Sequence, residues 1–196
     1  MKTQKILIFL FLIFCFAFSA SNAQNLTNTP NIKKFAMKKV WEVGGSIGFI
    51  ATTPVANGSS GDMTWNISFS PFGGFFVAKG LELGVMPSVS YTKHKNFFDF
   101  VDYTLYFAPA VNFLTKSKVF PYIMGLIGYC AQNGGGFTAS GLAWGGEGGI
   151  KINAYGNSLL KLGLQYEQKT LNPQNNTGGR NGQNNIKFEA GYNVFF

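Results

Sequence analysis

Residues 185–196, NIKFEAGYNVFF, separate two chemistries by alternation alone. One parity carries apolar side chains throughout: Ile186, Phe188, Ala190, Tyr192, Val194 and Phe196. Up to residue 193, the other parity carries charges, amides and one glycine: Asn185, Lys187, Glu189, Gly191 and Asn193. Because successive side chains of a β-strand point to opposite faces, the segment predicts a strand with one apolar and one polar face. A strand of a soluble β-sandwich has the same period as a strand that crosses a membrane. The rest of the chain must therefore decide whether the apolar face packs in a protein core or faces lipid.

Residues 1–23 have the three parts of a secretory leader. Lys2 and Lys5 precede an apolar run over residues 6–18, and small residues follow up to Ala23. This run is shorter than the roughly 20 apolar residues that a membrane-spanning helix needs. We therefore predict a signal peptide, residues 1–23, that is cleaved after Ala23.

Residues 24–196, which remain after cleavage, have the length of one domain. Their composition limits the chemistry and the partners that we expect. Cys130 is the only cysteine outside the leader, so no intramolecular disulfide is expected. The chain has 16 Lys and Arg against 8 Asp and Glu, but the lysines are scattered, and we expect no nucleic-acid partner. Residues 24–39, which carry four lysines, are predicted to be a flexible, solvated periplasmic lead-in.

Residues 40–196 contain no unbroken run of the length that a membrane helix requires. Their hydrophobicity instead alternates in segments of about ten residues, which is typical of transmembrane strands. We predict eight strands, over residues 40–51, 63–70, 81–91, 100–113, 119–130, 142–153, 160–167 and 185–196. Long polar connections alternate with shorter ones, which is typical of transmembrane barrels, and the even number of strands returns both ends of this region to the same side of a membrane.

Three details of these strands are open to test. Residues 72–79 are predicted to be a link between the second and third strands, and Pro87 suggests a β-bulge in the third. Residues 119–130 are apolar on both parities. We place Ile123, Ile127 and Tyr129 outward, although Tyr122, Met124 and Leu126 compete for that face.

Charge placement separates a membrane barrel from a soluble sandwich. On the assigned parities no charged residue points outward, where a Lys or Arg near the bilayer midplane costs about 2–4 kcal/mol. Nine charged residues point inward: Glu42, Glu82, Asp102, Glu147, Lys151, Lys161, Glu167, Lys187 and Glu189. Aromatic residues near the strand ends predict two girdles: Trp65, Tyr91, Tyr129, Trp144 and Tyr166 at one end, and Trp41, Tyr192 and Phe196 at the other.

Eight strands enclose a space just wide enough for side chains or one small ligand. Buried charges must pair, so a polar network that fills the bore is preferred to a polar conduit or a ligand site. The six acids outnumber the three bases. Some acids should therefore lie at the rims, meet water, hold a proton, or accept hydrogen bonds from Tyr106 or Asn112.

No constellation predicts catalysis or a cofactor. His94 is the only histidine, and nothing fixes it within reach of Ser88 or Ser90 as a nucleophile requires. One histidine is too few for a metal cluster, and the glycine runs at 134–136 and 145–149 lack the Lys-Ser/Thr of a phosphate loop. We expect neither an enzyme nor a bound cofactor or metal.

The terminal strand resembles the last strand of bacterial outer-membrane β-barrels, whose assembly signal is a terminal Phe with apolar or aromatic residues at alternate positions. Phe196, Val194, Tyr192 and Phe188 match that signal. With the leader and the eight strands, residues 40–196 are similar to the small OmpA/OmpX-type barrels of Gram-negative-type envelopes. The resemblance implies an all-β, closed antiparallel eight-stranded transmembrane barrel in the cell outer membrane, and a closed barrel alone satisfies every backbone group of the strands in lipid.

The same resemblance implies partners and a role. The partners are outer-membrane lipid, the barrel assembly machinery and an external surface ligand that the sequence does not identify, with the barrel as a monomer. The role is structural, in envelope integrity or in adhesion-like interaction at the cell surface, through the external loops. A porin-like narrow channel or small-ligand carrier is the alternative, followed by a lipid-modifying enzyme.

Overall fold

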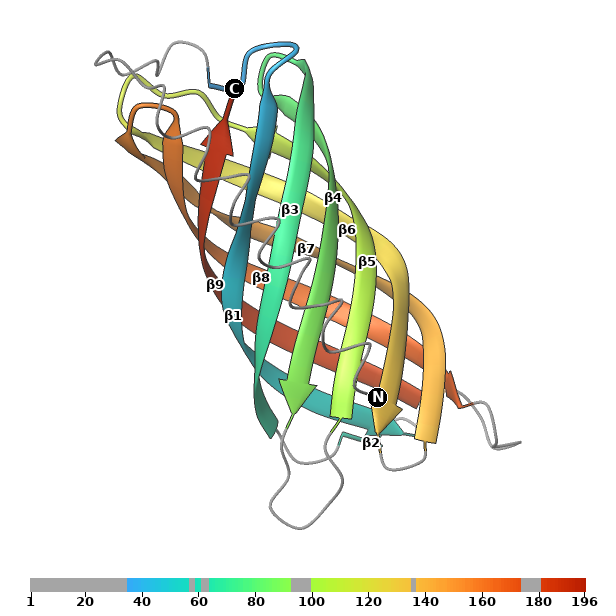
Figure 1. Cartoon of the computed structure of the whole chain (residues 1–196). Coiled ribbons are helices and arrows are strands. Elements are labelled where there is room, and N and C mark those ends of the chain that lie inside the picture. Colours follow the sequence, from blue (N-terminus) through green and yellow to red (C-terminus); the bar gives the residue numbers. More distant parts are fainter. Residues whose placement is uncertain (1–34, 57–58, 61–63, 93–99, 135–136, 174–180) are drawn as a thin grey trace, which may run out of the picture.

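The computed structural model describes residues 35–56, 59–60, 64–92, 100–134, 137–173 and 181–196. Each long strand pairs antiparallel with the next, and the last pairs with the first, so the sheet closes into a barrel (Figure 1). The eight long strands are β1 (Trp41–Ala56), β3 (Thr64–Ala78), β4 (Leu81–Thr92), β5 (Phe100–Asn112), β6 (Val119–Gly134), β7 (Phe137–Tyr155), β8 (Ser158–Pro173) and β9 (Asn181–Phe195). A short β2 (Ser59–Ser60) pairs with the end of β1. The predicted closed eight-stranded barrel is confirmed.

The two ends of the barrel differ. One end, which we call the turn end, carries the short connections at 79–80, 113–118 and 156–157 together with Phe196 (Figure 1). Gly80 and Gly156 adopt φ values of 78° and 54°, which glycine reaches without steric cost. At the opposite end, the loop end, β1 finishes and β9 begins. No helix in the described ranges is long and apolar enough to cross a membrane.

The predicted inward and outward parities are confirmed, including the ambiguous strand. In β6, Ile123 and Ile127 are each 61 % exposed, whereas Tyr122 and Met124 on the other parity are each 1 % exposed. All eight predicted girdle aromatics also lie on the outer surface. The chosen facing of residues 119–130 was therefore correct.

Two predictions about β3 and β4 were wrong. Residues 72–78 belong to β3 rather than to a link, because their backbone continues the ladders with β1 and β4. Pro87 causes no bulge: Phe69 faces Val89 on one side of it and Gly73 faces Val85 on the other, in the same register. Since a proline removes only one donor from the ladder, pairing can resume without a shift. The irregularity lies instead between Phe76 and Ala78.

The strands at the loop end are longer than predicted. Residues 131–134 of β6 pair with residues 137–140 of β7, although the glycine-rich stretch 131–141 predicted a loop. Residues 170–173 and 181–184 likewise extend β8 and β9 into the predicted connection 170–184. Backbone pairing continues there without an apolar face, so the hydrophobic alternation ends before the strands do.

The end of the predicted lead-in does not lie in solvent. Residues 24–34 are outside the described ranges, but Phe35 and Ala36 are buried inside the turn end. The ring centroid of Phe35 lies 5.6 Å from that of Phe76, 4.7 Å from that of Phe120 and 5.4 Å from that of Phe195. These four rings form an aromatic plug. Burial of the Phe35 ring among other aromatic rings is more favourable than its exposure to water. This gain outweighs the preference of the neighbouring lysines for solvent, on which the prediction of a solvated segment was based.

Candidate functional site

The interior of the barrel holds every charged residue that the sequence placed there. All nine are buried, none more than 7 % exposed, and they come from six strands: Glu42 of β1, Glu82 of β4, Asp102 of β5, Glu147 and Lys151 of β7, Lys161 and Glu167 of β8, and Lys187 and Glu189 of β9. The structure joins eight of them in three groups of contacts along the bore, and Asp102 stands beside the third.

The first group lies next to the aromatic plug. The ammonium of Lys151 is 2.8 Å from the Glu42 carboxylate and 3.2 Å from the Glu82 carboxylate. Asn193 donates to Glu42 at 2.5 Å, and Asn112 donates to Glu82 at 3.1 Å. Because Lys151 is on β7 and Glu82 on β4, this contact crosses the bore between strands that are not neighbours.

Lys151 also joins this group to the plug. Its ammonium lies 5.7 Å from the ring centroid of Phe35 and 5.4 Å from that of Tyr122. Both distances are within the range of a cation–π attraction, which strengthens where water is excluded. Phe35 and Ala36, the rest of the aromatic plug and the first ion group therefore pack against one another at the turn end.

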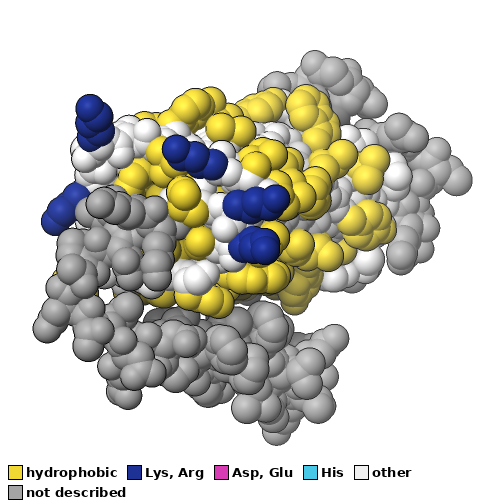
Figure 2. Space-filling model, turned by 90° about the horizontal axis from the view of Figure 1, so that it is seen from above, with side chains coloured by type: hydrophobic (Ala, Val, Ile, Leu, Met, Phe, Trp, Pro, Cys, Tyr) yellow, Lys and Arg dark blue, Asp and Glu magenta, His cyan; other side chains and the backbone are white. Residues whose placement is uncertain are grey.

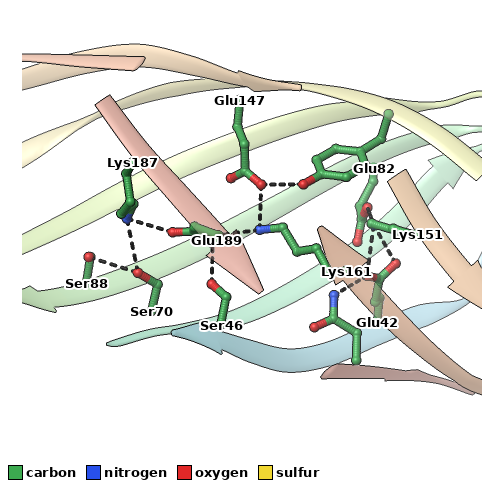
Figure 3. Close-up of polar contacts among 12 residues, drawn as sticks. Glu42, Ser46, Ser70, Glu82, Ser88, Glu147, Lys151, Lys161, Lys187 and Glu189 are labelled. Carbon is green, nitrogen blue, oxygen red and sulfur yellow. Dashed lines mark hydrogen bonds and ion pairs between the residues drawn. The ribbon is translucent and has the colours of Figure 1, made fainter. Parts of the chain in front are cut away.

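The second group occupies the middle of the barrel. Figure 3 shows the Lys161 ammonium between two carboxylates, 2.8 Å from Glu147 and 3.1 Å from Glu189. Glu189 also contacts Lys187 at 2.7 Å and accepts a hydrogen bond from Ser46 at 2.6 Å. The Tyr122 hydroxyl donates to Glu147. These charges are compensated by side chains from the same strand and from neighbouring strands.

The third group lies toward the loop end and contains a residue that the sequence analysis missed. Lys169 is buried and its ammonium is 3.2 Å from the Glu167 carboxylate. Glu167 also accepts hydrogen bonds from Asn185 at 2.7 Å, from Gln165 at 2.9 Å and from Tyr106, which reaches it across the bore. Lys169 shares the parity of Lys161 and Glu167, so extending that strand by two residues would have found it.

The charge balance follows from these contacts. With Lys169, the interior of the described barrel holds six acids and four lysines rather than the predicted six and three. The predicted hydrogen bonds from Tyr106 and Asn112 to acids are confirmed, to Glu167 and Glu82 respectively. Such donors are required because buried ions recover their lost hydration only through close partners and complete hydrogen bonding.

The two serines considered as nucleophiles contact other side chains in the described structure. Ser88 shares a 2.9 Å hydrogen bond with Ser70, and Ser90 donates to Asp102 at 3.3 Å. His94 lies in 93–99, outside the described residues. Among the residues that are described, no group of three or more His, Cys, Asp or Glu could hold a metal ion. Cys130 is a buried free thiol that faces the Gly141 carbonyl oxygen at 3.5 Å.

The residues of the predicted assembly signal lie at the seam of the barrel. Phe196 exchanges two backbone hydrogen bonds of 2.9 Å with Trp41, so the last residue helps to join β9 to β1. Tyr192 and Phe196 are exposed, and Val194 is 9 % exposed. The Tyr192 hydroxyl donates to the Ser158 hydroxyl at 2.6 Å. Recognition of Tyr192, Val194 and Phe196 by an assembly machinery stays a prediction.

Comparison with known proteins finds similarity of fold but not of sequence. No protein-family model and no curated protein matches the chain. Among solved structures, Neisserial surface protein A (NspA) aligns with a TM-score of 0.63 at 15 % identity, covering 79 % of this chain and 96 % of that protein. The outer membrane protein AlkL, solved in lipid bilayers, aligns with a TM-score of 0.54 at 9 % identity, covering 87 % of this chain and 96 % of its own. At these identities the alignments show the fold alone: the chain has the small eight-stranded β-barrel fold of these outer-membrane proteins, which is the fold that its resemblance to OmpA/OmpX-type barrels predicted.

Proposed function

We propose that this protein is an outer-membrane barrel with a closed bore, which acts as a membrane-integral scaffold and presents its external loops for envelope integrity or surface interaction. The observation that carries the proposal is the filling of the bore by the aromatic plug and three ion groups. The proposal assigns no catalytic step to the chain.

The outer surface supports insertion into lipid. Every long strand contributes exposed apolar side chains to a continuous belt, for example Ile47, Ile67, Val85, Leu105, Ile127, Trp144, Leu164 and Phe188. A soluble monomer rarely exposes a contiguous apolar patch of more than a few hundred Å². All charged side chains of the described strands point into the bore instead. A lipid environment on the outside accounts for both features.

The side chains inside the barrel support the proposal that the bore does not conduct ions. An ion that entered from the turn end would meet Phe35, Phe76, Phe120 and Phe195, and then the contacts of Lys151 across the bore. Further along, the contact between Tyr106 and Glu167 crosses the bore a second time. An eight-stranded barrel is narrow enough for side chains to fill it, so these layers leave its loops as the working surface.

Recording of single barrels in a planar bilayer tests this proposal. Folded protein, verified by its altered gel mobility before and after boiling, should insert without a steady current. Steady, protein-dependent, cation-selective current from the unmutated barrel would overturn the closed-bore proposal and favour the narrow channel. Altered lipid A in cells that express the protein would instead favour the enzyme.

A further inference from the structure

The turn end carries a group of exposed lysines. Figure 2 views the molecule from this end and shows lysine side chains but no coloured acidic side chain. Three segments supply these lysines, which we call the basic collar: Lys38 and Lys39 before β1, Lys79 between β3 and β4, and Lys116 and Lys118 between β5 and β6. The collar occupies one sector of the rim, because the β7–β8 connection at 156–157 carries no charge.

No acidic side chain offsets the collar within the described ranges. All six acidic side chains there lie inside the bore, and four buried lysines lie among them. Every exposed charged side chain in that part of the chain is a lysine of the collar. The terminal carboxylate of Phe196 also lies at this end, but at the seam with Trp41. The described rim therefore presents a net positive surface.

Backbone hydrogen bonds hold the three segments side by side. The Lys39 amide donates to the Phe76 carbonyl at 2.8 Å, and the Gly80 amide donates to the Ala36 carbonyl at 2.8 Å. The Asn112 amide in turn donates to the Gly80 carbonyl at 2.7 Å. Lys39 has a φ of 71°, which a non-glycine residue keeps only where its surroundings fix it. These bonds fix the backbone from which the lysine side chains of the collar extend, and the side chains themselves are exposed.

The collar lies just beyond the apolar belt. Exposed Trp41 follows Lys39 by two residues, exposed Leu81 follows Lys79 by two, and exposed Phe113 and Leu114 come shortly before Lys116. Aromatic and apolar residues at the end of a belt mark the boundary with lipid headgroups. Lysine stems lie along such a boundary while their ammonium groups reach outward. In a bilayer that surrounds the apolar belt, the ammonium groups would therefore lie at the level of the headgroup phosphates.

We propose that the basic collar binds the phosphate headgroups of anionic phospholipids in the leaflet that surrounds the turn end. This inference rests on the proposed membrane location and adds a lipid class to it. Each lysine near an anionic surface strengthens binding by roughly fivefold, and the attraction decays within a Debye length. The collar would enrich anionic lipid on one side of the barrel and fix how deeply the turn end sits.

Trp41 offers a local reporter for this enrichment. The double substitution Trp65→Phe and Trp144→Phe leaves Trp41, beside the collar, as the only tryptophan. The protein is refolded into vesicles that contain either brominated phosphatidylglycerol or brominated phosphatidylcholine at the same mole fraction. Bromine quenches only nearby tryptophan. We expect several-fold stronger quenching by the anionic lipid at low salt, and a smaller preference at high salt.

Matched variants test the role of the lysines. The triple substitution Lys79→Gln, Lys116→Gln and Lys118→Gln changes connections outside the strands, and should remove most of the preference. Arginine at the same three positions keeps the charge and should retain it. A second reporter that keeps Trp144 alone, at the loop end, should show no preference that depends on the collar.

The outcomes separate this inference from the proposed function. Equal quenching by both lipids in properly inserted barrels, or a preference that survives the glutamine variant, would overturn lipid binding by the collar. Lysine-dependent co-sedimentation with isolated peptidoglycan, together with equal quenching, would make the cell wall the partner and overturn it as well. Failure of folded protein to insert into any vesicle would contradict the membrane location itself.

Discussion

The two halves of the bore compensate their buried charged side chains in different ways. Toward the turn end, Lys151 holds two acids across the barrel and the aromatic plug closes the mouth. Toward the loop end, Glu167 has one lysine and three uncharged donors, and inward-facing Thr52, Asn66 and Gln132 are only half-buried. Ion pairs that cross the bore thus lie in the half that the aromatic plug covers, whereas partly buried hydroxyls and amides line the other half.

The largest expected effect concerns the seam at the turn end. Replacing Phe196 with Asp should block assembly while export continues, because it alters the predicted assembly signal and the residue that joins β9 to Trp41. Fractionation of cells and the heat-dependent gel shift measure this. Trp65→Ala, which changes an exposed aromatic residue toward the loop end, is the control and should assemble. Normal outer-membrane yield of the Phe196 variant would remove support for the signal.

The next effect compares two of the four buried lysines, one from each half of the bore. Lys151→Ala leaves Glu42 and Glu82 without their shared cation, and should lower the free energy of unfolding by about 3–5 kcal/mol. Lys169→Ala should cost clearly less, because Glu167 keeps hydrogen bonds from Asn185, Gln165 and Tyr106. Urea unfolding in liposomes gives both values. Equal losses would show that the halves do not differ in this way.

The aromatic plug comes next. Phe35→Ala should lower the free energy of unfolding by about 3 kcal/mol, since a large buried ring is lost among three others. Phe35→Leu fills more of the space and should cost less. Bilayer recording should detect brief openings only in the alanine variant. If neither stability nor current changes, the plug does not close the turn end.

The smallest effect concerns two tyrosines that donate to buried acids. Tyr122→Phe should cost about 2 kcal/mol, because among the described residues Glu147 then keeps its contact with Lys161 alone. Tyr106→Phe should cost about 1 kcal/mol, because Glu167 retains several other partners. Unfolding of both variants under the same conditions checks the order. A larger loss for Tyr106→Phe would reverse it.

The sequence by itself separated the two faces of each strand, and for every strand except residues 119–130 the polar parity also indicated which face points inward. Alternation along the chain depends only on the period of a β-strand, so Ile123 and Tyr122 could be assigned to opposite faces before their neighbours were known. The inward position of nine charged residues followed from the same period, and the donors Tyr106 and Asn112 followed from the need to satisfy buried acids.

The tertiary structure alone decided which of these residues meet. Lys151 reaches Glu82, and Tyr106 reaches Glu167, across a bore whose strand tilt and register bring distant positions to one level. Phe35 gave no periodic signal, because it lies outside every strand, yet it fits the mouth formed by Phe76, Phe120 and Phe195. Alternation fixes the face on which a side chain lies, but only closure of the barrel fixes its height and its opposite partner.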